Sequence, residues 1–177
     1  PGKGVWGPAA DAKKAAAVIT TAIDNGVNFI DTAEMYPIGG NAQIFGSTER
    51  HIGTWIKKIG ASEREKLVLA TKIAGPNRGM EYIRQPLDFS KKSIHEAVEL
   101  SLKNLQTDYI DLYQMHWPER VMNMFQKRGV QEIDTKWQDN IFDVLITSRR
   151  MNQSFRPEVF CPRRSFLIKR MCLGTFS

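Results

Sequence analysis

Four side chains that could act together in carbonyl reduction lie near the ends of three short apolar runs. They are Asp31, Tyr36, Lys72 and His116. A phenol can protonate a carbonyl oxygen if its pKa, about 10 in water, is lowered toward the working pH. A lysine ammonium lowers that pKa because its charge favours the phenolate, and a carboxylate keeps a buried lysine charged and oriented. A histidine can hydrogen-bond the carbonyl and fix its direction.

Each of these residues, taken alone, has a more ordinary interpretation. Asp31 suits a turn, and Tyr36 suits an aromatic packing position. Lys72 suits a solvated strand end, and His116 suits a structural histidine. Their joint occurrence near successive strand ends favours a reaction site over four unrelated roles.

The apolar runs predict short β-strands over residues 27–31, 66–72 and 109–115. In the first, Val27, Phe29 and Ile30 are of the bulky or β-branched types that pack well on a pleated surface. The runs are nearly continuously apolar, which is typical of strands covered on both faces.

Helices are predicted before each strand, because apolar residues recur there at helical spacing. Their expected ranges are residues 11–25, 48–59 and 91–105. The expected N-caps are Asp11, Ser47 and Ser90, and the expected helix-ending glycines are Gly26 and Gly60.

The alternation of helix and strand predicts an α/β domain with a parallel sheet. Right-handed crossovers then put the C-terminal end of every strand at the same edge. Asp31, Lys72 and His116 are therefore expected to share one rim, with Tyr36 in the loop after Asp31.

Composition limits the class of protein. The 177 residues, 42% of them hydrophobic, suit a single globular domain with a real core. No apolar run is long enough to span a membrane, and no signal peptide is visible. The two cysteines lack metal-ligand spacing and favour a reducing compartment, so we expect a cytoplasmic protein, or a plastid one if a targeting segment is missing.

The net charge of +6 is confined to the C-terminal stretch. From Ser148 onward there are seven Lys or Arg and one Glu, so residues 1–147 carry no net charge. We therefore expect no nucleic-acid partner for the main body. Residues 148–177 show neither helix nor strand period, and we divide the chain into a domain over 1–147 and a basic tail over 148–177.

Two motifs resemble those of the aldo-keto reductases. They are Asp31–Tyr36 (DTAEMY) and Asp111–Pro118 (DLYQMHWP), with Lys72 closing a strand between them. The resemblance covers about residues 1–145, and it is nearest to the bacterial and plastid branch with a longer loop after the histidine. Residues 117–137 would form that loop, and residues 139–147 would begin a fourth helix.

The resemblance implies a (β/α)₈ barrel that reduces aldehydes or ketones to alcohols with NADPH. It assigns Tyr36 as general acid, Lys72 as its pKa partner, Asp31 as the charge partner of Lys72, and His116 as the carbonyl-orienting group. It implies no metal. Sites of this kind lie at the C-terminal face of the barrel strands, which agrees with the expected rim.

The chain departs from the family in length. A complete barrel runs to roughly 250 residues, whereas this sequence predicts only its N-terminal half, followed by the tail. In the family the main clamp on NADPH comes from the second half, so no cofactor-binding residue is assigned. We expect weak or no activity from this chain alone, and self-association through the open barrel edges. The alternative is a non-catalytic NADPH-binding or regulatory subunit with the reductase fold.

The remaining candidates receive structural roles. His51 and His95 are expected on helix surfaces, and residues 62–66 are expected to form a solvated turn. The apolar residues of the second helix are read as core. The physiological carbonyl substrate does not follow from the sequence, because substrate choice depends on loop details.

Overall fold

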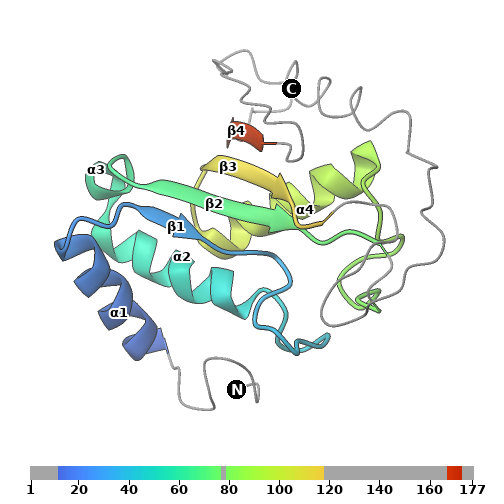
Figure 1. Cartoon of the computed structure of the whole chain (residues 1–177), viewed down its shortest axis with the longest axis horizontal. Coiled ribbons are helices and arrows are strands. Elements are labelled where there is room, and N and C mark those ends of the chain that lie inside the picture. The colour runs from blue at the N-terminus through green and yellow to red at the C-terminus, as the bar shows by residue number, and fades with distance from the viewer. Residues whose placement is uncertain (1–11, 77–78, 118–166, 173–177) are drawn as a thin grey trace, which may run out of the picture.

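The computed structural model describes residues 12–76, 79–117 and 167–172, and it confirms the alternation of helices with parallel strands (Figure 1). The elements are α1 (Ala12–Asp24), β1 (Phe29–Asp31), α2 (Ser47–Ile59), α3 (Ala61–Arg64), β2 (Val68–Ile73), α4 (Lys91–Leu105), β3 (Tyr109–Met115) and β4 (Leu167–Cys172). Their bounds differ by at most two residues from those expected for the first three helical patterns and three strands.

The strands form one sheet in the order β1-β2-β3-β4 (Figure 1). β1 pairs with β2 and β2 with β3, both in parallel, whereas β4 is antiparallel to β3. In this register Asp31 lies opposite Ala70, and Lys72 lies opposite Gln114. The three parallel strands therefore bring their C-terminal ends to one edge, as the sequence predicts.

Two elements were not expected. α3 occupies Ala61–Arg64, where the sequence suggests only a polar turn, and β4 occupies part of the stretch without a period. Arg64 at the end of α3 is buried, and its guanidinium donates to the backbone carbonyl of Tyr109, so a contact distant in sequence fixes this helical turn. β4 supplies backbone partners to an edge of β3 that would otherwise lack them.

The expected helix caps are partly confirmed. The Ser90 hydroxyl oxygen accepts the N–H of Ser93 at the start of α4, over 3.3 Å. The prediction of Ser47 as the cap of α2 is wrong, because the helix begins at Ser47 and the cap position is Gly46. Gly46 has a φ of 71°, a left-handed conformation that glycine adopts without the steric cost that serine carries.

The main hydrophobic core fills the space between one face of the sheet and the helices. Its buried members come from α2, α4 and the strands: Ile52, Trp55, Ile56, Leu67, Leu69, Ile73, Phe89, Ile94, Ala97, Val98, Leu102, Leu105, Ile110 and Tyr113. On the other face Phe29 stays 48% exposed. The strands of the described part are thus closely covered on the helix side. On the face that carries Asp31 and Lys72, the end of β1 is exposed, whereas Ala70 of β2 and Leu112 of β3 are buried.

Helix α2 packs closely against the end of α4 at Gly53. A Cβ on Gly53 would lie 2.6 Å from the carbonyl carbon and 2.8 Å from the Cα of Leu105. We expect Gly53→Ala to lower the free energy of unfolding by about 1–3 kcal/mol, because the clash is with backbone and cannot be relieved by a rotamer change. Urea denaturation measures this. Lys58→Ala, on the exposed side of the same helix, should change it by less than about 0.5 kcal/mol.

Several expectations lie outside the described residues. They are the cap at Asp11, nearly all of the loop over residues 117–137, the helix over residues 139–147 and most of the tail. The domain boundary at residue 147 stays a prediction for the same reason.

Candidate active site

The first pair of the site is an ion pair between neighbouring strands. Lys72 Nζ lies 2.7 Å from Asp31 Oδ2 and also donates to the carbonyl oxygen of Thr32, over 2.8 Å. The Lys72 side chain is 14% exposed and that of Asp31 is 45% exposed. The ammonium is thus held by two acceptors from the end of β1, with little access to water.

Gln114 is a member of this site that the sequence reasoning missed. Its Nε2 donates to Asp31 Oδ1 over 3.2 Å, so the two carboxylate oxygens of Asp31 have separate partners. Gln114 is two residues before His116 in sequence, and its Cα partner in the sheet is Lys72. The period of two along the strand could have identified it, because alternate strand residues share a face.

The aromatic members lie beside this pair. The rings of Tyr36 and His116 meet edge to face, with centroids 5.6 Å apart and planes at 79°. Lys72 Nζ lies 5.7 Å from the centre of the Tyr36 ring. All four residues expected at the rim are therefore close together, and they come from three successive strand ends.

The expected lowering of the Tyr36 pKa is wrong for this chain. Burial raises the pKa of the phenol above 10.0, and the negative charge of Asp31 raises it further. The Lys72 ammonium donates to Asp31 and to the Thr32 carbonyl, and these two acceptors offset part of its effect on the phenol. Tyr36 consequently keeps its proton at neutral pH.

His116 is held as a neutral imidazole. Burial lowers its pKa from 6.5 to about 4, and the nearby Lys72 charge lowers it as well, while Asp31 acts in the opposite direction. Its Nδ1 is buried and has no hydrogen-bond partner among the described residues. The ring packs on Trp117, with centroids 4.8 Å apart, and the Trp117 indole donates to the carbonyl oxygen of Pro76.

This lowered pKa makes the stability of the fold depend on pH. The unfolded chain takes up a proton on His116 near pH 6.5, whereas the folded chain does so only near pH 4. Stability is therefore complete above pH 6.5 and falls as the pH drops from 6.5 to 4, by about 2 kcal/mol after allowance for partial exposure. Urea denaturation across this range measures the loss, and His116→Gln should remove that part of it. An unchanged pH dependence in His116→Gln would contradict the assignment.

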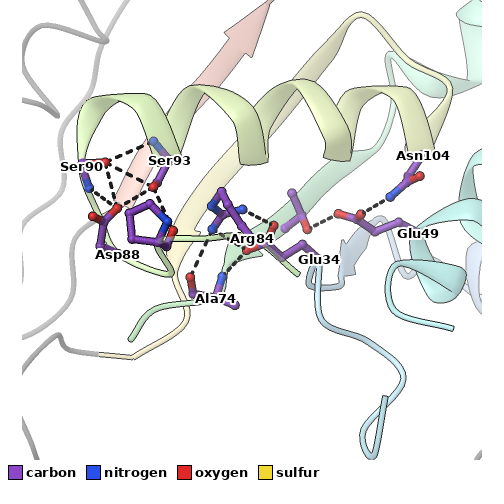
Figure 2. A network of polar contacts seen from close by, with 10 residues as sticks. Glu34, Glu49, Ala74, Arg84, Asp88, Ser90, Ser93 and Asn104 are labelled. Atoms are coloured by element: carbon purple, nitrogen blue, oxygen red, sulfur yellow. Dashed lines mark hydrogen bonds and ion pairs between the residues drawn. The ribbon is translucent and has the colours of Figure 1, made fainter. Parts of the chain in front are cut away.

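A buried ion pair joins Glu34, in the loop between Asp31 and Tyr36, to Arg84 (Figure 2). Glu34 is fully buried, and its two carboxylate oxygens accept from the Arg84 guanidinium over 3.1 and 3.2 Å. The N–H of Ala74 also donates to Glu34. Neither charged residue was singled out from the sequence, where Arg84 lies in a loop without a period.

A second buried carboxylate, Glu49 of α2, lies farther along the same layer (Figure 2). It accepts from the hydroxyl of Thr71 over 2.7 Å and from the side-chain amide of Asn104 over 3.1 Å. Burial raises the pKa of Glu49, although these hydrogen bonds oppose the shift. The network joins α2, β2 and α4 and connects the layer behind the site to the helices.

The other two histidines differ from the surface position expected for them. His51 and His95 lie on α2 and α4 as expected, but both are partly buried, and Nε2 of His95 is buried without a partner among the described residues. The described part of the chain contains no cluster of three or more side chains suited to a metal ion. Its helices are also too short or too polar for any of them to cross a membrane.

The part of the chain that contains these site residues is similar to known proteins. The model of the "Aldo/keto reductase family" matches residues 2–145. Protein tas of Escherichia coli is 44% identical over 125 residues, which are 70% of this chain and 36% of that protein. The aldo-keto reductase yakc [NADP(+)] of Schizosaccharomyces pombe is 37% identical over 112 residues, which are 63% of this chain and 30% of that protein.

A solved structure shares the fold. It is a Pseudomonas aeruginosa protein assigned to the aldo-keto reductases, 24% identical, with a TM-score of 0.53 over 80% of this chain and 45% of that one. The chain spans about a third of the length of the curated relatives it matches. Its parallel sheet and helices thus correspond to the N-terminal part of a barrel fold.

Proposed function

Because the chain belongs to the aldo/keto reductase family, we propose that it carries the proton-transfer half of an NADPH-dependent carbonyl reductase site. The observation that carries this proposal is the meeting of four side chains at one sheet edge: Asp31, Tyr36, Lys72 and His116. A protonated phenol and a neutral imidazole there can both hydrogen-bond one carbonyl oxygen.

The steps assigned to these residues are binding, orientation and proton donation. The His116 imidazole orients the carbonyl, and the Tyr36 hydroxyl donates the proton that the developing alkoxide takes. Lys72, held by Asp31, stabilises the negative charge left on the phenol oxygen. NADPH, when bound, supplies the hydride to the carbonyl carbon.

The residues present suit the reacting end of that cofactor and its substrate. Asp31 is 45% exposed and Phe29 is 48% exposed, so the site is accessible to a ligand from the side of β1. The name of the S. pombe relative includes NADP(+), which supports NADPH as the cofactor. We assign no residue to its phosphates, and we infer that the grip on them lies outside the described residues.

We also propose that this chain reduces carbonyls only weakly, and that it belongs to the branch of the family with the long loop after His-Trp-Pro. The test is oxidation of NADPH by the purified chain with a reactive aromatic aldehyde, followed by loss of NADPH absorbance. NADPH fluorescence quenching measures binding separately. Tyr36→Phe purified in parallel shows how much of the rate comes from contaminating reductases. Equal rates in the two preparations would reject catalysis by this chain.

A non-catalytic NADPH-binding or regulatory subunit is the second candidate. The raised pKa of Tyr36 favours it, because a proton donor works best when its pKa lies near the working pH. NADPH binding without turnover dependent on Tyr36 would support this second function. Turnover dependent on Tyr36 would exclude it.

A further inference from the structure

The buried Glu34 carboxylate connects the two chain segments that carry the proposed acid and its lysine. Tyr36 follows Glu34 by two residues, and Lys72 precedes Ala74 by two residues. The Glu34 side chain accepts the Ala74 N–H, and the backbone N–H of Glu34 donates to the carbonyl oxygen of Lys72 over 3.2 Å. One residue thus joins the end of β1 to the end of β2 through both its backbone and its side chain.

Arg84 completes this connection. Its guanidinium holds both oxygens of Glu34 and also donates to the carbonyl oxygen of Ala74, over 3.4 Å. The Arg84 side chain is 6% exposed. The carboxylate can therefore rotate neither away from Ala74 nor toward water without losing charge-assisted hydrogen bonds.

Apolar residues next to this pair in sequence, Ala33, Met35 and Ile83, belong to a small cluster that also contains Ala74, Leu87 and Trp117, with Tyr36 and Met80 packed against it. The buried Glu49 carboxylate also interacts with Glu34. Buried ion pairs of this kind are often no more stabilising than well-packed apolar residues of similar volume. Stability alone is therefore a weak reason for the pair, whereas the directed contact with Ala74 gives it a geometric function.

We propose that Glu34 is a positioning residue, which together with Arg84 sets the placement of the Tyr36 phenol against Lys72 and the His116 ring. Its effect on catalysis rests on the proposed function. The placement itself is a property of the folded chain and is measurable without turnover, through the pKa of the His116 ring that lies against Tyr36.

The first test replaces the pair by apolar side chains of similar length, E34M/R84M. This variant leaves no buried charge unpaired, so it should fold, but it has no acceptor for the Ala74 N–H. We expect the pKa of His116, followed by NMR of the imidazole, to rise from about 4 toward 6.5 as the ring gains water. The chain has three histidines, and His116→Gln assigns the signal. An unchanged pKa would overturn the proposal.

A matched control exists at the opposite end of the sheet. Arg64 and Asp111 also form an ion pair, over 2.8 Å, in which Arg64 is buried and Asp111 partly buried, and Asp111 Oδ2 accepts the N–H of Leu69 from β2, over 2.9 Å. R64M/D111M removes the same kinds of contact far from the site. It should leave the pKa of His116 where it was. An equal rise in both variants would mean general loosening of the fold and would reject a specific role for Glu34.

Glu34→Asp provides the test if E34M/R84M does not fold. It keeps the charge and shortens the reach by one methylene group, so the carboxylate cannot serve Ala74 and Arg84 together. We again expect a rise in the pKa of His116, and no rise would contradict the proposal.

Where the chain turns over an aldehyde, Glu34→Asp should lower kcat by at least about tenfold with little change in KM, because misplacement affects the chemical step. Absence of turnover in the unsubstituted chain would reject the proposed function, and the NMR comparison would still decide on positioning.

Discussion

Tyr36→Phe should lower NADPH-dependent reduction of an aromatic aldehyde by about 10²–10⁴-fold, the usual contribution of a positioned general acid. The substitution removes one hydroxyl group and keeps the ring, so the edge-to-face contact with His116 at 5.6 Å remains. Because the pKa of the phenol is raised, the hydroxyl is protonated at neutral pH and its loss removes a donor, not an anion. The measurement is kcat, with NADPH fluorescence quenching to show that binding survives.

Tyr82→Phe is the matched control for this loss. Burial raises the pKa of Tyr82 as well, but its ring packs on Phe45, with centroids 6.1 Å apart, and is not among the four residues of the site. Turnover should be unchanged in Tyr82→Phe. If the two variants have the same rate, Tyr36 is not the proton donor.

Arg84→Met should destabilise the fold by about 3–5 kcal/mol, the usual cost of leaving a buried charge without its partner. The Glu34 carboxylate is fully buried, and without Arg84 it keeps the hydrogen bond from the Ala74 N–H but loses its positively charged partner. Urea denaturation of the single and double variants gives the measurement. E34M/R84M should recover most of the loss, because it removes the unpaired charge as well.

An exposed ion pair shows what burial contributes to this effect. Lys66 and Glu63 lie 2.6 Å apart, but their side chains are 65% and 51% exposed. Lys66→Met should therefore change the free energy of unfolding by no more than about 1 kcal/mol. Two results would contradict this account of the buried pair. One is a loss of stability in Arg84→Met as small as that in Lys66→Met. The other is a loss in E34M/R84M as large as that in Arg84→Met.

The helices and parallel strands were predictable because their patterns are local. Apolar residues recur at helical spacing from Lys91 to Leu105, and a largely apolar run extends from Tyr109 to Met115. The ranges expected from these two patterns are those of α4 and β3. The common rim then follows from the parallel arrangement of the strands, because their C-terminal ends share one edge. The site residues were found for the same reason, since Asp31 and His116 stand where such runs end.

The polar contacts behind the rim were not predictable in this way. Glu34 and Arg84 are 50 residues apart, and Glu49 and Asn104 are 55 apart, with nothing periodic to relate them. The direction of the Tyr36 pKa also escaped prediction. The residue types suggest that Lys72 lowers it, but the sign depends on where the ammonium points and on how deeply the phenol is buried.

The order of the sheet has a consequence for synthesis on the ribosome. β1, β2 and β3 are neighbours in the sheet in the order in which they are translated, so each new strand meets a partner that has already emerged. The carboxylate, phenol, lysine and imidazole all lie between Asp31 and His116. We therefore expect the rim to assemble during elongation, before any later segment is available, which agrees with the usual N-terminal-first folding of nascent chains.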